Sequence, residues 1–245
     1  MTPEPDLPRY LQLLWGREPE GRRGPKPGRS ITDIGAAAVS IADDRGLESV
    51  SMKAVAEALG LTTMSLYRYL DSKEQLYLVM LDVAYGPPPP GLTTRGGWRT
   101  RLERWAGALA DTVTAHPWSV SVPTHEPPST PNLLRWTDAG VGAFSGTRLT
   151  GQQKLSSLLV VDGYVRQHVA MSVQFGLVGG DAGAPRDGTE GFGARMLHLL
   201  DTEHFPSLLA VAPALQDDDA DFYGAELAFG LRIVLDGVAA LVARS

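Results

Sequence analysis

The stretch from Ser51 to Lys73 constrains the fold of this chain more than any other part of its sequence. Its three candidate helix-capping residues, Ser51, Thr62 and Ser72, each stand ahead of a short segment with apolar residues at helical spacing. Gly60 lies between the first two segments, where a helix commonly ends in a left-handed residue. The sequence therefore predicts two short helices joined by a glycine turn, followed by the start of a third.

The second of these short helices carries small polar, hydroxyl and aromatic groups in place of a row of charges. Leu66 and Leu70 are predicted to point inward, and the residues left on the other faces are Thr63, Met64, Ser65, Tyr67 and Tyr69. Such a surface fits the major groove of DNA, where hydroxyls meet base edges and a thioether can touch a thymine methyl. Lys53 and Lys73 add positive charge, and the free amides of the helix start at Lys73 also favour a phosphate. The alternative is a helical corner of an all-α enzyme.

From Ser30 to Tyr85 the chain resembles the DNA-binding domain of the TetR family of transcriptional regulators. The resemblance rests on three segments in order: ITDIGAAAVSIADDRG, SMKAVAEALG and TTMSLYRYLDSKEQL. The first has an inward stripe of Ile31, Ile34, Ala38 and Ile41, and Gly46 stands at its end. The resemblance implies that Tyr67 bonds a phosphate, and that Arg68, at a position that varies in the family, is an additional candidate. The other implied DNA contacts are Ser51, Lys53, Thr62, Thr63, Met64, Ser65, Tyr69 and Lys73.

A basic, proline- and glycine-rich arm precedes this domain. The formal net charge of −6 runs against DNA binding, but the arm concentrates cations just ahead of the first helix, at Arg22, Arg23, Lys26 and Arg29. Arms of this kind enter the minor groove, where A·T-rich DNA concentrates negative potential. The alternative is a tail that takes no part. Still earlier, Pro8 to Trp15 predicts two turns of amphipathic helix whose role the sequence leaves open.

A run of four prolines divides the chain after the helix that ends at Tyr85. Pro87 to Pro90 cannot continue a helix, so we expect three parts: an N-terminal arm at 1–29, a helix-turn-helix domain at 30–85 and a larger domain at 92–245. The third part shows helical periodicity and no alternating strand runs of useful length. Its predicted helices cover 98–115, a piece after 117, 132–144, 152–177, 192–200 and 220–243. The predicted fold class is all-α.

Two helices of the larger domain are candidates for self-association. The last helix and the helix from Gln152 carry more apolar residues than one packing face needs. Periodicity alone is equally consistent with a wholly intramolecular core. The family resemblance favours a homodimer held by a four-helix bundle. The predicted interface residues are Leu158, Val165, Leu227, Leu231, Ile233, Val234 and Val238.

The larger domain also resembles the ligand-binding domain of one subgroup of TetR-like regulators. The resemblance rests on HPW at 116–118 and PNLLRW at 131–136. It implies a small-molecule effector, and the number of tryptophans favours an aromatic or multicyclic one whose identity the sequence does not give. The predicted lining residues are Trp105, Trp118, Asn132, Trp136, Tyr164, Gln167, His168, Met171 and Phe175. The glycine-rich stretch at 176–193 is interpreted as a surface loop or as a flap over this site.

Other function classes find little support in the sequence. It contains no cysteine, no apolar run long enough for a membrane span, no catalytic or phosphate-binding motif and no histidines at metal-ligand spacing. We therefore expect no enzyme activity, no cofactor, no metal and a cytoplasmic location. The expected function is that of a dimeric repressor that binds a palindromic DNA operator and is released by its effector. The alternative is an all-α small-molecule-binding protein or enzyme with a vestigial helix-turn-helix.

Overall fold

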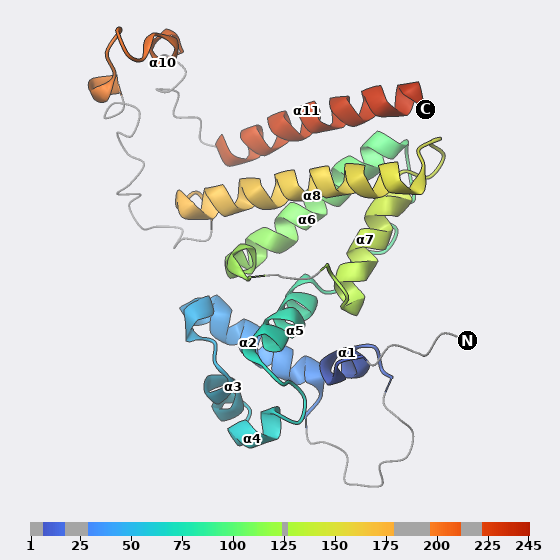
Figure 1. Cartoon of the computed structure of the whole chain (residues 1–245), viewed down its shortest axis with the longest axis vertical. Helices are drawn as coiled ribbons and strands as arrows, with labels where there is room; N and C mark the ends of the chain where they lie inside the picture. Colours follow the sequence, from blue (N-terminus) through green and yellow to red (C-terminus); the bar gives the residue numbers. More distant parts are fainter. Residues whose placement is uncertain (1–6, 18–28, 124–126, 179–196, 212–221) are drawn as a thin grey trace.

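The computed structural model describes residues 7–17, 29–123, 127–178, 197–211 and 222–245. Within these ranges the regular structure is entirely helical, so the predicted fold class is confirmed (Figure 1). Arg22, Arg23 and Lys26 of the predicted basic arm lie outside the described residues, as does most of the glycine-rich stretch at 176–193. Of the arm's cations, Arg29 lies within them and is exposed.

The helix-turn-helix unit forms as its capping residues predict. Helix α2 (Ile31–Arg45) begins at Ser30 with a reciprocal capping box, because Ser30 and Asp33 each accept a backbone hydrogen bond from the other. A short 3₁₀ turn, η1 (Leu47–Ser49), leads to α3 (Met52–Ala58) and then α4 (Thr63–Leu66). Helix α4 has only one turn and is shorter than the sequence predicts, but the turn after it still buries Leu70.

Helix α5 (Lys73–Tyr85) joins the two halves of the molecule. It packs along α2, and Gly35 allows this close approach because a Cβ there would lie 2.7 Å from a methyl group of Val83. Its inward residues include Leu76 and Met80, both completely buried. Helix α5 ends at Gly86, just before the proline run, as predicted.

The larger part of the molecule is a bundle built on four long helices. These are α6 (Trp98–Ala115), α7 (Pro131–Ala143), α8 (Gly151–Gln174) and α11 (Phe222–Arg244), with a 3₁₀ turn, η2 (Pro117–Ser121), after α6. Figure 1 shows α11 beside α8, and α6 and α7 on the other side of α8. The short α10 (Pro206–Ala210) stands away from this bundle.

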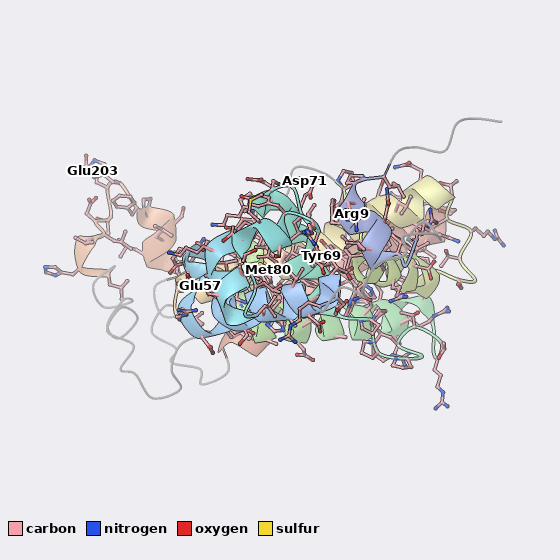
Figure 2. All side chains as sticks on the ribbon, turned by 90° about the horizontal axis from the view of Figure 1, so that it is seen from below. Arg9, Glu57, Tyr69, Asp71, Met80 and Glu203 are labelled. Atoms are coloured by element: carbon pink, nitrogen blue, oxygen red, sulfur yellow. The ribbon has the colours of Figure 1, made fainter. Side chains whose placement is uncertain are left out.

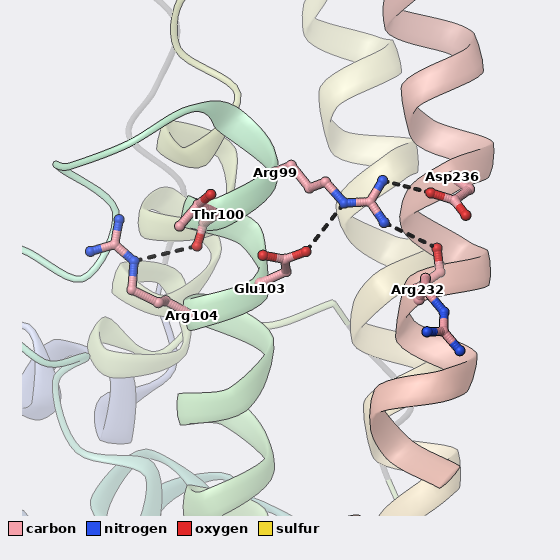
Figure 3. Close-up of polar contacts among 6 residues, drawn as sticks. All are labelled: Arg99, Thr100, Glu103, Arg104, Arg232 and Asp236. Atoms are coloured by element: carbon pink, nitrogen blue, oxygen red, sulfur yellow. Dashed lines mark hydrogen bonds and ion pairs between the residues drawn. The ribbon is translucent and has the colours of Figure 1, made fainter. Parts of the chain in front are cut away.

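Polar contacts also tie α6 to α11 at one end of the bundle (Figure 3). The guanidinium of Arg99 donates to Asp236 at 2.6 Å and to Glu103 at 3.2 Å, and so links one carboxylate on each helix. Another nitrogen of the same guanidinium donates to the backbone carbonyl of Arg232 at 3.5 Å. The spacing between these two helices is therefore fixed at this end, while farther along they diverge around a groove described below.

Three of the predicted dimer contacts are buried inside the subunit, which corrects their assignment, while the other four stay predictions. The three buried residues occupy the faces of α8 and α11 that pack toward the rest of the bundle, because the wider apolar stripe of each helix faces the core. Leu158, Val165 and Val238 are buried, and Leu227, Leu231 and Val234 are half-buried against the core. Ile233 alone of the predicted set points outward, with 57% of its surface exposed.

Candidate nucleic-acid interface and effector groove

Helices α3 and α4 form a compact corner whose geometry depends on one glycine and two caps. Gly60 adopts a φ of +67°, a conformation that side chains rarely tolerate. The hydroxyl of Ser51 accepts a hydrogen bond from the amide of Ala54 at 3.1 Å, and that of Thr62 accepts one from the amide of Ser65 at 3.2 Å. These bonds satisfy amides that would otherwise be free at the helix starts.

The outer surface of this corner presents large apolar and aromatic groups to solvent. Met64 is 75% exposed and Tyr67 is 46% exposed, although both neighbour the completely buried Leu66. Thr63 and Ser65 are half-buried beside them. A thioether and a phenol exposed on a rigid corner are available to a partner, because contact with it would remove apolar surface from water. Met64 and Tyr67 are among the residues predicted to contact DNA, and that role stays a prediction.

Two lysines flank this surface and differ in how they are held. Lys53 is exposed and lies 3.8 Å from Glu57, one turn along α3, where solvent weakens the attraction. The ammonium of Lys73 lies 5.2 Å from the centre of the Tyr77 ring and stands on the first turn of α5, whose start is capped by Ser72. A phosphate at that helix start would meet both the cation and free backbone amides.

Tyr69 and Arg68, both predicted DNA contacts, also take part in contacts within the chain. The hydroxyl of Tyr69 donates to the backbone carbonyl of Arg29 at 3.0 Å, so within this chain it anchors the N-terminal side of the domain. The backbone carbonyl of Arg68 accepts a hydrogen bond from Arg9 at 2.6 Å, while its side chain remains exposed. Figure 2 shows Arg9, Tyr69 and Asp71 together in this region.

The residues predicted to line an effector site fall into separate groups, so their assignment to one site stays a prediction. The indole N–H of Trp105 donates to the carbonyl of Trp136 at 2.9 Å, and both rings are buried in the core. The indole N–H of Trp118 donates to Asp43 at 2.6 Å, which ties η2 to α2. At the other extreme, Gln167, Met171 and Phe175 are exposed on the outside of α8.

Asn132 is also occupied, in a polar contact between α7 and α5. Its backbone N–H donates to a carboxylate oxygen of Asp82 at 2.7 Å, and its side-chain amide donates to the other carboxylate oxygen and to the Asp82 carbonyl. Burial raises the pKa of Asp82, although the bond from the Asn132 backbone N–H acts in the opposite direction. Nearby, Arg166 on α8 donates to the hydroxyl of Tyr85, whose pKa is raised by burial. The last turn of α5 is thus bonded to both α7 and α8.

An apolar groove does lie between α6 and α11, next to two of the predicted residues. It has a volume of about 380 Å³, and its lining residues are Gly107, Ala110, Asp111, Thr114, Ala115, Tyr223 and Leu227. His168 contacts its Tyr223 wall, with ring centres 4.8 Å apart and a 3.1 Å hydrogen bond to the Tyr223 carbonyl. Tyr164 stacks beside His168 and donates to the Glu226 carbonyl at 2.8 Å. The groove is within the size range of small-molecule sites.

The groove was missed because its floor is made of small residues. Gly107, Ala110 and Thr114 recur at spacings of three and four along α6 and so lie on one face of the helix. Their side chains are too small to fill the space between α6 and α11. That spacing is visible in the sequence and could have indicated a groove. The α11 residues that line the groove could not be predicted in this way, because the sequence of one helix does not show which of its residues face another helix.

The outer faces of α8 and α11 carry an exposed apolar surface that the sequence only partly predicted. The two helices lie side by side, as the hydrogen bond from Tyr164 to the Glu226 carbonyl requires. Their exposed large apolar residues are Leu155, Leu159, Val160, Met171, Phe175, Phe229 and Ile233. We refer to this set as the outer face. Exposed apolar residues gathered on two adjacent helices are found at protein–protein interfaces.

Sequence comparisons identify both parts of the chain. Residues 34–80 match the family described as bacterial regulatory proteins, tetR family, and residues 89–242 match the tetracyclin repressor-like C-terminal domain. The chain is 34% identical to the HTH-type transcriptional repressor DrrR1 of Streptomyces coeruleorubidus over 98% of its own length and 88% of that protein. It is 25% identical to an HTH-type transcriptional regulator of Saccharopolyspora erythraea over 62% of this chain and 64% of that protein.

Solved structures with the same fold agree with this identification. A protein from Streptomyces coelicolor A3(2) described as a possible TetR family transcriptional regulator superposes with a TM-score of 0.66 and 25% identity, covering 86% of this chain and 100% of that one. ActR from S. coelicolor without ligand superposes with a TM-score of 0.73 at 18% identity, over 90% of this chain and 99% of its own. ActR bound to actinorhodin superposes with a TM-score of 0.70, also at 18% identity, over 88% of this chain and 97% of its own.

These relatives are regulators rather than enzymes, and no helix among the described residues is long and apolar enough to cross a membrane. The capped α3–α4 corner, the larger helical domain and the matches over nearly the whole length agree with one another. The chain belongs to the TetR family of transcriptional regulators.

Proposed function

We propose that this regulator represses transcription by binding a palindromic operator as a homodimer, and that a multicyclic aromatic ligand releases it. The observation that carries the proposal is the α3–α4 corner, which holds Met64 and Tyr67 out in solvent beside Thr63 and Ser65. These groups suit base edges, thymine methyls and phosphates in a major groove. The flanking Lys53 supplies charge where the chain as a whole is acidic.

The dimer is proposed to form through the outer face of α8 and α11. Four helices, two from each subunit, would bury the exposed apolar residues of both copies in one bundle. A twofold-symmetric dimer presents two α4 helices to one side of a duplex, which is the geometry that an inverted repeat requires. The exposed Ile233 and Leu159 support this choice, because nothing within the described part of the subunit covers them.

The effector is proposed to bind in the groove between α6 and α11. The groove has apolar walls with a few polar groups, among them Asp111, Thr114 and Tyr223, that could orient a ligand. Actinorhodin, the ligand in one ActR complex, is a reasonable first probe of the chemical class. A ligand present at 100 times its dissociation constant should raise the free energy of unfolding by about 2.7 kcal/mol. A thermal-shift screen of multicyclic aromatic compounds tests this part of the proposal.

The DNA-binding part is tested by fluorescence anisotropy with duplexes from the regions that flank the protein's own coding sequence. Tyr67→Phe and Lys73→Ala remove phosphate contacts, so each should weaken binding to all duplexes alike. Thr63→Ala should relax preference at particular base pairs. Arg148→Ala is the matched control, because it removes an exposed cation from the larger domain. Wild-type affinity in both Tyr67→Phe and Lys73→Ala would contradict the proposed surface.

A further inference from the structure

The N-terminal helix α1 (Arg9–Leu14) is built into the fold, although the family match begins only at residue 34. Tyr10 and Leu11 are buried, and the helix packs on α2 and α5. Six residues make too short a helix to be stable alone in water. The helix is therefore held by its contacts, and what it contacts decides what it can do.

The two ends of α1 are hydrogen-bonded to different domains. At one end, the guanidinium of Arg9 donates to the carbonyl of Arg68, in the turn that follows α4, at 2.6 Å. At the other end, the indole N–H of Trp15 donates to the carbonyl of Ser129, just before α7, at 3.0 Å. One bond reaches the DNA-binding corner and the other reaches the effector-binding domain (Figure 2 labels Arg9 beside Tyr69).

The turn after α4 has few constraints of its own. Helix α4 is a single turn, and the residues that follow it are held by short-range backbone bonds such as that from the Tyr69 amide to the Leu66 carbonyl. Leu66 and Leu70 anchor this turn in the core, and two long-range hydrogen bonds join it to the N-terminal segment. The side chain of Arg9 donates to the Arg68 carbonyl, and the Tyr69 hydroxyl donates to the Arg29 carbonyl. A one-turn helix takes its orientation from such external contacts.

The start of α7 lies next to Ser129, and α7 packs on α6, which lines the proposed effector groove. Asn132 in the first turn of α7 is bonded to Asp82 of α5, so the two helices move together at this point. A displacement of α7 therefore acts on α5 directly and on α1 through the Trp15–Ser129 bond. Both routes lead to the α3–α4 corner, one through α5 and the other through α1.

We propose that α1 is a strap that ties the turn after α4 to the start of α7, and so sets the orientation of the DNA-binding corner relative to the effector-binding domain. A segment that only covered the core would need Tyr10 and Leu11 but neither terminal bond. The regulatory role of the strap rests on the proposed function, because the orientation of α4 affects DNA affinity only if α4 binds DNA. The physical tie itself can be tested without DNA.

The test is hydrogen exchange of the full chain, measured by mass spectrometry, on variants that cut one tie at a time. Trp15→Phe keeps an aromatic ring but removes the N–H that bonds Ser129. Arg9→Met keeps an unbranched side chain but removes the donor to Arg68. Gln12→Met is the matched control, because it removes a side-chain bond to the Leu7 carbonyl that stays within the N-terminal segment.

We expect Trp15→Phe to raise the exchange rates of the 63–70 amides about fivefold, although the changed residue contacts the other domain. Arg9→Met should do the same, while Gln12→Met and the amides of α6 should stay at wild-type rates. The strap is refuted if Trp15→Phe leaves the exchange rates of the 63–70 amides unchanged, or if Gln12→Met raises them equally. Helix α1 would then only cover the core.

Operator affinity measured on the same samples separates this proposal from the proposed function. Faster exchange at 63–70 together with weaker DNA binding supports both. Faster exchange in a protein whose wild type binds no DNA supports the strap and contradicts the proposed function. If Arg9→Met is too unstable to study, Trp15→Phe alone decides, because its ring is 40% exposed and its loss opens no core cavity.

Discussion

Single residues fix the ends of the helices in the DNA-binding corner, and these were predictable. The hydroxyls of Ser51, Thr62 and Ser72 all accept a hydrogen bond from an amide three residues later, at 3.1 to 3.3 Å. Capping depends on one side chain and its own neighbours in sequence, so it can be read locally. The turn at Gly60 is also predictable locally, because glycine is the residue that most readily adopts a positive φ.

A pair of glycine substitutions tests this residue-level reading. Gly60→Ala should lower the free energy of unfolding by roughly 1 kcal/mol or more, because alanine is strained at a φ of +67° even though space is available. Gly107→Ala, inside α6 with nothing within 4 Å of an added Cβ, should raise it by about 0.5–1 kcal/mol. Urea denaturation followed by circular dichroism measures both. Equal effects of the two changes would contradict the reading.

The buried Asp82 leads to a prediction about pH. Its pKa is raised above 3.8 by burial, so the folded state binds a proton more tightly than the unfolded state does. The stability from this proton is present at low pH and is lost as pH rises through the raised pKa. The asparagine of Asp82→Asn cannot titrate, so the variant does not lose this stability. The difference in free energy of unfolding, variant minus wild type, should therefore increase from pH 3.8 upward and become constant above the raised pKa. Urea titrations across this range check it, and parallel curves would oppose the assignment.

What single residues could not reveal is whether an aromatic or polar side chain lines a site or completes the core. Trp105 and Trp136, predicted as pocket walls, are buried side by side, and the Trp105 indole donates to the Trp136 carbonyl. Asn132, predicted for the same site, donates to Asp82. The residue types are right for either role. Only the packing of distant helices decides between them, and that is a tertiary property.

At the scale of elements, helix positions were predictable and helix faces were not. The prediction of 98–115 agrees with α6 at both ends, and those of 132–144 and 220–243 agree with α7 and α11 to within two residues at each end. Helices α8 and α11, however, are apolar on two sides, and periodicity does not say which side faces the core. The predicted dimer residues accordingly include three that are buried inside the subunit, Leu158, Val165 and Val238.

Two neighbouring positions on α11 distinguish the inner from the outer face. Ile233→Arg places a charge in the proposed dimer interface, where an unpaired charge costs several kcal/mol, so it should give a folded monomer with a wild-type helical spectrum. Leu231→Arg places the same charge against the subunit core and should lower the melting temperature sharply. Sedimentation equilibrium and thermal denaturation measure the two outcomes. A dimeric Ile233→Arg protein would remove the outer face from the interface.

At the scale of the whole molecule, an acidic protein is expected to bind a polyanion through a locally basic surface. The net charge is −6, so attraction to DNA depends on cations near the α3–α4 corner rather than on the overall field. If a dimer makes about 6–10 phosphate contacts, its affinity should fall by roughly a thousandfold or more between 50 and 200 mM salt. Anisotropy titrations over this range measure the slope, and an affinity independent of salt would contradict phosphate contacts.

The most direct test of the central claim is selection of binding sites from random duplex DNA by the full-length protein. The account predicts enrichment of an inverted repeat whose half-sites are centred about one helical turn, or a multiple of it, apart. The monomeric Ile233→Arg variant should enrich no such repeat. No enrichment by the wild type, or enrichment of a single sequence without twofold symmetry, would contradict a dimer that reads a palindrome through α3 and α4.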